Sequence, residues 1–243
     1  MPNHVANRIT SNKETLDEII SIGDDAKEEV DFNKIIPTPK EIGKRYAVKS
    51  DVEMIAKISM GLIDFNLQPV DRTRLFRDGK YRELTDVLSK DNAIRLYLLK
   101  NHMANDLNDE EFEIFIEYMR AYRKLGCMNW YDWNIKNWGT KWNAYSFKRL
   151  NERQIYFETA WSAPFPVIDK LHELTQKHII HEWADEDVGS NVGRREYKKG
   201  GRIRMFHEDF SNKKEGYELA FELMPEYKEN YVFDGEKYIY DED

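Results

Sequence analysis

The sequence of 243 residues predicts an α+β fold in which a helical segment is inserted between two strand-bearing parts. Toward both ends of the chain, short stretches alternate apolar and polar residues, which is typical of strands with one buried face. Between about residues 50 and 126, apolar residues instead recur at the spacing of a helix. Because no Ser-, Gly- or Pro-rich linker separates these textures, we expect the helical segment to be an insertion and not an independent domain.

Composition indicates a globular protein without an overall basic surface. Hydrophobic residues make up 41% of the chain and charged residues 34%, enough for a core and a solvated surface. The net charge of -8 argues against a general nucleic-acid binder, because such a protein must neutralise phosphates. Cys127 is the only cysteine, which excludes an internal disulfide and fits a reducing compartment. With no signal peptide and no apolar run of about 18 residues, we expect a cytoplasmic protein without a membrane span.

Residues 1–45 are predicted to form a strand–helix–strand (βαβ) unit that contributes to the main fold. Val5–Ile9 alternates and predicts the first strand. Ser11 followed by Glu14 predicts a capping box at the start of the helix, because the two side chains can satisfy free backbone N–H groups there. Val30–Ile36 predicts the second strand, which a proline then ends because it lacks the N–H of a sheet ladder.

Residues 46–128 are predicted to form the helical insertion. Its clearest helix begins after Asn108, a good N-cap with Glu111 three residues later, and ends at Gly126. The apolar stripe of this helix consists of Phe112, Phe115, Ile116, Met119 and Tyr122. We interpret the stripe as core packing, and a partner-binding groove is the alternative.

Residues 129–243 are predicted to hold most of the sheet. The stretch Trp130–Trp161 contains five of the six tryptophans, and each large ring buries roughly 150–250 Å² when it is inside. The predicted elements are strands at Tyr145–Leu150, Gln154–Trp161 and Ile179–Trp183, a helix that begins near Pro164 and Pro166, a hairpin turning at Gly200–Gly201, a helix that buries Leu219, Ala220 and Leu223, and a hairpin around Asp234–Gly235.

Five stretches carry a family resemblance when they are taken together: MPNHVANRIT at the start, FNKIIP at 32–37, NWGTKWNA at 137–144, FETAW at 157–161 and ADEDVGSN at 184–191. In combination they resemble the YubB ferredoxin-like family, whose members are carried by phages, plasmids and related mobile elements. The resemblance fades across roughly residues 45–125. It implies a ferredoxin-like antiparallel sheet with helices packed on one face in residues 129–243. It also implies a mobile-element accessory protein that acts on its host, and it transfers no catalytic residue.

The first candidate site is the run from Trp138 to Asn143. Gly139 lets the backbone turn or approach a ligand closely. The run also places polar donors, Thr140, Lys141 and Asn143, beside the rings of Trp138 and Trp142, a chemistry suited to stacking a base or another flat ring. The alternative is a tight turn whose tryptophans support the sheet.

The second candidate is the acidic run Asp185-Glu186-Asp187, with Asn191 and, on the preceding strand, His181. Several oxygen ligands suit a hard cation. However, the spacing is not that of an EF-hand, and neighbouring side chains of an extended segment point to opposite faces. The alternative is a solvated turn that caps backbone N–H groups.

The third candidate is a basic hairpin whose cations could bind phosphate or RNA. Its basic residues are Arg194, Arg195, Lys198, Lys199, Arg202 and Arg204. They follow the acidic run directly and could pair with it or protect a sheet edge, since lysine and arginine blunt edge strands.

Neither a catalytic set nor a metal or cofactor motif is marked in the sequence. The histidines show no HxH or HxxxH pair, and there is no GxSxG elbow and no P-loop. We therefore expect no catalytic residue, no metal and no cofactor. The candidate ligand- or partner-binding residues are Trp138, Gly139, Thr140, Lys141, Trp142, Asn143, Glu158, Trp161, Asp185, Asp187, Asn191 and Arg194.

The resemblance and the composition together favour a non-enzymatic accessory protein of a phage or mobile element. It would bind and modulate a host protein in the host-cell cytoplasm, with defence components (anti-phage or CRISPR) among the candidates. The first alternative is a small-ligand or nucleotide binder that uses Trp138 and Trp142. The second is a metal-dependent nuclease or hydrolase that uses Asp185–Asp187. The helical insertion is the expected source of partner specificity.

Overall fold

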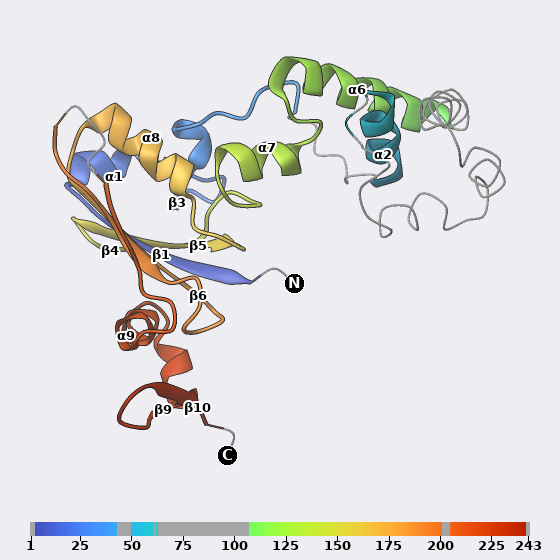
Figure 1. Cartoon of the computed structure of the whole chain (residues 1–243). Coiled ribbons are helices and arrows are strands. Elements are labelled where there is room, and N and C mark those ends of the chain that lie inside the picture. Colours follow the sequence, from blue (N-terminus) through green and yellow to red (C-terminus); the bar gives the residue numbers. More distant parts are fainter. Residues whose placement is uncertain (1–2, 43–49, 61, 63–106, 201–204, 242–243) are drawn as a thin grey trace. The chain divides into compact units, whose positions relative to one another are not determined.

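The structure is a computed structural model and describes residues 3–42, 50–60, 62, 107–200 and 205–241 (Figure 1). The chain divides into two compact units, which we call the sheet unit (residues 1–38 and 134–243) and the helical unit (residues 39–133). The predicted opening unit and C-terminal part therefore form one unit. The borders between the two units lie at 38/39 and 133/134, several residues from the predicted borders at 45 and 128.

A six-stranded antiparallel sheet forms the centre of the sheet unit, in the order β4-β5-β1-β6-β7-β8. The strands are β1 (His4–Thr10), β4 (Tyr145–Asn151), β5 (Gln154–Ala160), β6 (Ile179–Asp185), β7 (Gly193–Tyr197) and β8 (Met205–Asp209). β1 pairs with two neighbours, so that Asn7 lies opposite Phe157 of β5 and opposite Trp183 of β6. The strands predicted at Val5–Ile9, Tyr145–Leu150, Gln154–Trp161 and Ile179–Trp183 are confirmed, and the first of them lies in the middle of the sheet.

The connections define the fold. α1 (Lys13–Ile19) follows β1, and α8 (Phe165–Thr175) joins β5 to β6. The chain order β1-α1-β4-β5-α8-β6 with the spatial order β4-β5-β1-β6 is the βαββαβ arrangement of a ferredoxin-like domain. β7 and β8 extend the sheet beyond β6, and the helical unit lies within the connection from α1 to β4. The predicted ferredoxin-like fold class is confirmed.

α1 and α8 lie on one face of the sheet, as Figure 1 shows. Because side chains alternate along a strand, Val5 and Ile9 point to this face while Ala6 points to the other. Val5 and Ile9 are fully buried, as are Leu16 of α1 and Leu171 of α8. The hydrophobic residues that predicted the strand and the two helices thus form the core of the sheet unit.

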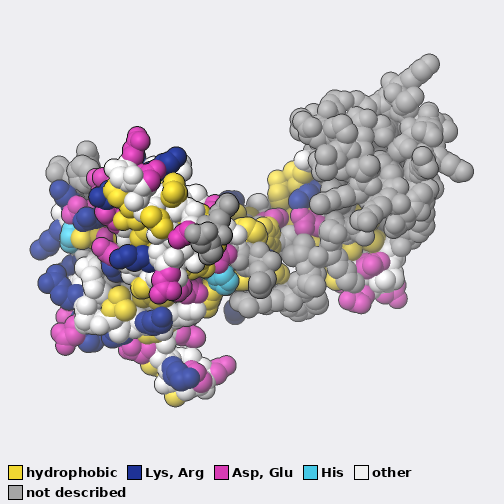
Figure 2. Space-filling view, turned by 90° about the horizontal axis from the view of Figure 1, so that it is seen from below, with side chains coloured by type: hydrophobic (Ala, Val, Ile, Leu, Met, Phe, Trp, Pro, Cys, Tyr) yellow, Lys and Arg dark blue, Asp and Glu magenta, His cyan; other side chains and the backbone are white. Residues whose placement is uncertain are grey.

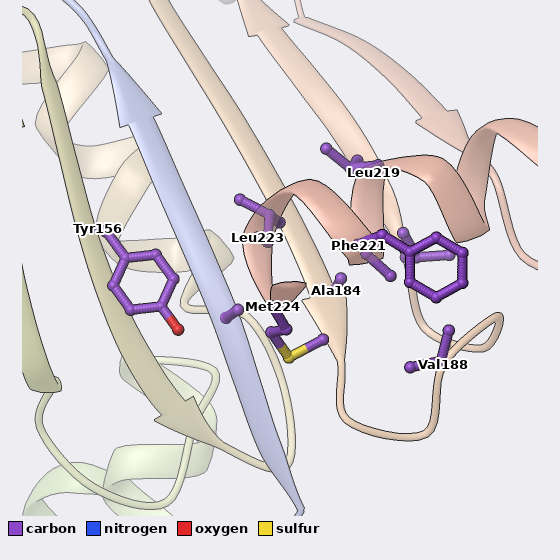
Figure 3. Packing of buried hydrophobic residues seen from close by; sticks show 10 residues of the cluster. Tyr156, Ala184, Val188, Leu219, Phe221, Leu223 and Met224 are labelled. Carbon is purple, nitrogen blue, oxygen red and sulfur yellow. The ribbon is translucent and has the colours of Figure 1, made fainter. Parts of the chain in front are cut away.

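α9 (Lys214–Leu223) packs on the opposite face, an addition to the predicted arrangement of helices on one face. Leu219 and Leu223 pack near Ala6 and Ala184, whose small side chains allow the helix to approach the sheet (Figure 3). The 3-10 helix η2 (Pro225–Asn230) follows α9. The terminal hairpin is confirmed as β9 (Tyr231–Phe233) and β10 (Tyr238–Tyr240).

The strand predicted over Val30–Ile36 is wrong beyond its first residue. β3 (Glu28–Val30) pairs with β2 (Ile20–Ile22) in a separate two-stranded sheet, and the 3-10 helix η1 (Phe32–Lys34) follows. Asp31 starts this turn, because its side chain accepts a hydrogen bond from the backbone N–H two residues later. The opening unit is therefore not a βαβ unit, since its second strand does not join the main sheet.

The capping box predicted at Ser11 and Glu14 is also wrong. The N-cap of α1 is Asn12, and its side chain makes no capping hydrogen bond to the backbone. Ser11 Oγ instead donates to the carbonyl oxygen of His178 at 2.7 Å. The hydroxyl is thus used to tie the end of β1 to the start of β6 and not to begin the helix.

In the helical unit the structure describes α2 (Ser50–Ser59), α6 (Asp109–Leu125) and the first half of α7 (Trp130–Asn137). The capping box of Asn108 with Glu111 and the left-handed end of α6 at Gly126 are both confirmed. The apolar side of α6 that packs on α2 consists of Ile114, Phe115 and Tyr118, with Ile116, Met119 and Tyr122 at its border. Phe112 lies outside this core, so the predicted stripe is rotated toward Ile114 and Tyr118.

The rest of the predicted insertion, residues 63–106, lies outside the described residues. Within the described ranges, no helix combines the length and the apolar character needed to cross a membrane.

Candidate functional site

The candidate residues come from three separate stretches, and the sheet brings most of them to one of its ends. Because β1 runs antiparallel to both neighbours, His4 lies opposite Ala160 and Val5 lies opposite Asp185. Asn3 connects the two sides. Its carbonyl oxygen accepts the backbone N–H of Trp161 at 2.9 Å, and its side chain donates to Asp185 Oδ1 at 3.0 Å. We call this part of the molecule the strand-end surface.

Trp138 is a core residue of the sheet unit. Only 1% of its surface is exposed, and its indole N–H donates to the carbonyl oxygen of Ile36 at 2.9 Å. Its ring meets Phe32 edge-on at a centroid distance of 5.6 Å. Phe32 in turn packs against Phe157 of β5. This tryptophan therefore anchors η1 and the residues that follow it to the sheet.

The residues after Trp138 hold the loop in place. Gly139 has φ +79, and a Cβ at this position would lie 2.7 Å from Cδ of Pro166. Thr140 is buried, and its hydroxyl donates to the carbonyl oxygen of Ala160 at 2.8 Å. Asn143 Oδ1 accepts the backbone N–H of Phe32 at 2.9 Å. Glycine, threonine and asparagine thus have structural partners on three neighbouring segments.

Trp142 is the part of this loop that faces solvent. Its side chain is 37% exposed, and Lys141 Nζ lies 4.6 Å from the centroid of its ring. Since Trp138 is buried, the two indoles do not form a pair of open faces around a flat ligand. The exposed platform is Trp142 together with Lys141.

Trp161 combines exposure with an unusual backbone conformation. It follows β5 directly, is 48% exposed and has φ +73. A bulky residue in the left-handed region is an outlier that neighbouring structure must hold in place. The hydrogen bond from its backbone N–H to Asn3 supplies part of that constraint. The nearby bond from Ser162 Oγ to the carbonyl oxygen of Gly139 ties the Trp142 loop to the same segment.

The acidic run forms a closed turn. Asp185 is only 5% exposed, and its carboxylate accepts hydrogen bonds from Asn3 Nδ2, from Asn191 Nδ2 and from the backbone N–H of Asp187, each at 3.0 Å. The carboxylate of Asp187 accepts the hydroxyl of Ser190 at 2.8 Å. No group of three potential metal ligands comes together in the described part of the chain. The geometry therefore gives Asp185, Asp187 and Asn191 a role in shaping the loop.

The basic hairpin does not form one patch on the described residues. Arg194 lies opposite Glu182 and Glu208 in the sheet register. Arg195 points to the other face, where its guanidinium carbon lies 3.6 Å from the centroid of the Phe165 ring. Arg202 and Arg204 lie outside the described residues. Figure 2 shows basic and acidic side chains interspersed over the described surface in that view.

Three side chains next to the strand-end surface were missed in the sequence analysis. The Tyr145 hydroxyl lies 2.8 Å from His4 Nδ1, and Tyr156 donates to Glu158 Oε1 at 2.9 Å. Burial and, after it, Glu158 and Glu186 raise the pKa of Tyr145 to about 12. The alternation of β1 and β5 could have placed His4, Tyr156 and Glu158 on one face, but only once the pairing of these strands is known.

His181, which the sequence grouped with the acidic run, lies elsewhere. It is four residues before Asp185 on the same strand, which corresponds to roughly 13 Å. It is fully buried, and its Nε2 lies 3.0 Å from Asn7 Oδ1. The Asn7 amide also donates to Thr159 Oγ1 at 2.9 Å. These residues form a buried polar row across the middle of the sheet.

The topology and the strand-end surface define a ferredoxin-like domain that carries partly exposed tryptophans at one end of its sheet. Residues 137–225 match the family model described as the ferredoxin-like domain in Api92-like protein. The match begins just before Trp138 and ends after α9. A crystal structure of the protein api92 from Yersinia pseudotuberculosis is similar at 12% sequence identity, with a TM-score of 0.34, over 86% of this chain and 99% of that chain. No curated protein matches the chain.

Proposed function

We propose that this protein is a non-enzymatic accessory protein that binds and modulates a host protein through the strand-end surface. The observation that carries the proposal is Trp161, a half-exposed indole fixed in a left-handed backbone conformation. Strained, exposed residues of this kind are concentrated at functional sites. Tryptophan is also among the residues that contribute most to protein–protein binding when its ring is buried by a partner.

The neighbourhood of Trp161 supports protein binding. Trp142 gives a second exposed ring on a loop that Thr140 and Ser162 tie to the Trp161 segment. Both rings project from segments fixed by buried hydrogen bonds, so little conformational entropy is lost when a partner covers them. The strand-end surface is therefore preorganised for an interface.

The sequence resemblance to the YubB ferredoxin-like family supports the biological setting that we propose. In this setting a phage or another mobile element encodes the protein, which acts in the host-cell cytoplasm. Defence components are the first host proteins to test. The helical unit, which the resemblance does not cover, is proposed to set which partner is bound.

The test is affinity capture from host lysate, followed by reconstitution of the captured protein with the purified chain. We expect one stoichiometric partner for the wild type and at least about a tenfold loss of its affinity in Trp161→Ala, which corresponds to about 1.4 kcal/mol. The matched control is Leu174→Ala, because Leu174 is also exposed but lies near the end of α8. The control should bind as the wild type does.

Two results would contradict the proposal. One is an empty capture by a chain whose circular dichroism and thermal unfolding show that it is folded. This result would favour the small-ligand alternative at Trp142 and Lys141. The other is equal loss of affinity in Trp161→Ala and Leu174→Ala, which would show that the strand-end surface is not the contact.

A further inference from the structure

The face of the sheet that carries α9 is only partly covered by this helix. α9 packs mainly on β6 and β1. Figure 3 shows Tyr156 on β5, on the far side of β1 from α9. We call the β4–β5 half of this face, with the adjoining end of β1, the open face. Its side chains are His4, Tyr145, Lys148 and Glu158, and the Tyr156 side chain is buried beside them, with 8% of its surface exposed.

The open face is continuous with the strand-end surface. Tyr145 begins β4 three residues after Trp142, and Glu158 lies on β5 three residues before Trp161. The hydrogen bond between His4 and Tyr145 and that between Tyr156 and Glu158 hold these side chains against the sheet. A partner that covers the two exposed tryptophans would therefore extend onto the open face.

The open face and its border carry carboxylates that no lysine or arginine of the described residues pairs with. These are the carboxylates of Glu158, Glu186 and Glu226. None of the three has a lysine or arginine within 4.0 Å in the described ranges, and the ion pair of Glu158 is with His4 at 3.9 Å. Burial first, and then Glu186, Glu226 and Glu158, raise the pKa of Tyr227 in η2, as expected where a negative potential opposes ionisation.

The same face already holds a cation of the chain itself. Lys148 Nζ lies 5.1 Å from the centroid of the Tyr156 ring. The electron-rich face of an aromatic ring attracts a cation at this distance. The half-buried Tyr145, which lies opposite Glu158 in the sheet register, offers a second ring, and the two residues together provide both contacts that a guanidinium group uses, stacking and charge-assisted hydrogen bonding.

We propose that the open face docks a basic, arginine-bearing segment of the protein partner. The inference rests on the proposed function and gives the chemistry of the partner. An acidic segment would be repelled by the carboxylates, and an apolar one would desolvate Glu158 without offering it a donor. An arginine side chain can lie on the Tyr145 ring and donate to Glu158 and Glu186.

The first experiment measures binding of a fluorescent, terminally blocked peptide of arginines spaced by glycine and serine. Fluorescence anisotropy compares it with the same peptide in which citrulline replaces arginine. We expect the full-length protein to bind the arginine peptide and not the citrulline peptide. Binding should weaken as salt is raised from about 50 to about 300 mM, because exposed charges are then screened.

The variant Glu158→Gln with Glu186→Gln should lose about tenfold in affinity for the arginine peptide. Glutamine at 158 can still accept the Tyr156 hydroxyl, so the face keeps its shape. The control is Glu18→Gln with Glu152→Gln, which changes the net charge equally at exposed positions in α1 and in the β4–β5 turn. Equal loss in both double variants, or equal binding of the citrulline peptide, would overturn the proposal.

The captured host partner separates this inference from the proposed function. If Trp161→Ala loses the partner while Glu158→Gln with Glu186→Gln keeps it, the proposed function stands and the arginine contact is wrong. If neither variant affects binding of a reconstituted partner, both are wrong. Loss in both variants, with binding retained by Glu18→Gln with Glu152→Gln, is the expected result.

Discussion

At the scale of single residues, the buried polar row constrains the protein most. The Asn7 amide already donates to the carbonyl oxygen of Val5 and to Thr159, so Asn7 Oδ1 is the acceptor and His181 Nε2 carries the proton. The other ring nitrogen of His181, Nδ1, is buried without a hydrogen-bond partner among the described residues, so a second proton there would place an unpaired charge in the core. The burial of His181, and secondarily the charge of Arg195, lower its pKa from 6.5 to about 3.

This lowered pKa predicts acid destabilisation. In the unfolded chain His181 binds a proton below about pH 6.5, whereas in the folded protein it stays neutral down to about pH 3. The free energy of unfolding should therefore fall as the pH drops from about 6.5, by about 2 kcal/mol at pH 5. Urea unfolding of the wild type and of His181→Gln at pH 7 and pH 5 measures this difference.

The variant provides its own control, because glutamine does not titrate and the other ionisable groups are shared. His181→Gln should be less stable than the wild type at pH 7 and should lose less stability between pH 7 and pH 5. Parallel pH profiles for the two proteins would show that His181 is not the group responsible.

At the scale of elements, the loop from Trp138 to Asn143 combines buried residues that support the fold, such as Trp138, with an exposed one, Trp142. Gly139 is the position where the loop passes closest to α8. Its positive φ alone disfavours a side chain, and the Pro166 ring leaves no room for one. The Thr140 and Ser162 hydrogen bonds to the neighbouring segments depend on this close approach.

Gly139→Ala should therefore destabilise the sheet unit by about 1–3 kcal/mol. The matched control is Gly235→Ala, since Gly235 also has a positive φ, +104, but nothing lies within 4 Å of a Cβ there. The control should lose only the conformational part, about 1 kcal/mol or less. Thermal unfolding of both variants measures the difference, and equal losses would mean that the contact with Pro166 is unimportant.

The elements that could be predicted from the sequence are those whose signals are local. The capping box of α6 uses residues three apart, and alternation alone marks β1 and β5. The turn after β3 has a local contact at Asp31, but Phe32 also donates its backbone N–H to Asn143, 111 residues away, and the sequence alone does not indicate that partner. Without knowledge of that partner, the apolar residues of Val30–Ile36 are typical of a strand.

The residues of the candidate site could be predicted from the sequence, but the contacts between them could not. Residue type alone predicted Trp142, Trp161 and Asp185 as candidate site residues. It could not show that Asn3 links Trp161 to Asp185, because that link exists only after β1 has paired on both sides. The roles of Trp138 and Thr140 as core residues likewise depend on partners in distant segments, Ile36 and Ala160.

At the scale of the whole molecule, the helical unit is inserted into the sheet unit, and contacts within the sheet unit hold the two ends of the insertion together. The Trp138 indole is bonded to Ile36, so the two ends of the sheet unit that flank the insertion are held together within that unit. The entropy of closing a loop grows slowly with its length, so a short loop can replace a long one.

A chain in which a flexible Gly/Ser linker replaces residues 39–133 should therefore fold, with a cooperative thermal transition and the near-ultraviolet signal of packed tryptophans. According to the proposed function, it should also lose partner specificity, which the same capture experiment measures. A linker variant that is unfolded would show that the sheet unit needs the helical unit. One that binds the partner with unchanged affinity would refute the role of the insertion in specificity.

The central position of β1 also determines how the protein emerges from the ribosome. Its neighbours on both sides, β5 and β6, are translated only after the whole helical unit. At about 5–20 residues per second, the first strand waits roughly 7–30 s for Gln154, its earliest partner in the sheet, to be added. During that time Val5, Ala6 and Ile9, fully buried in the native protein, have no strand to pair with, and an unpaired apolar strand of this kind is prone to aggregation.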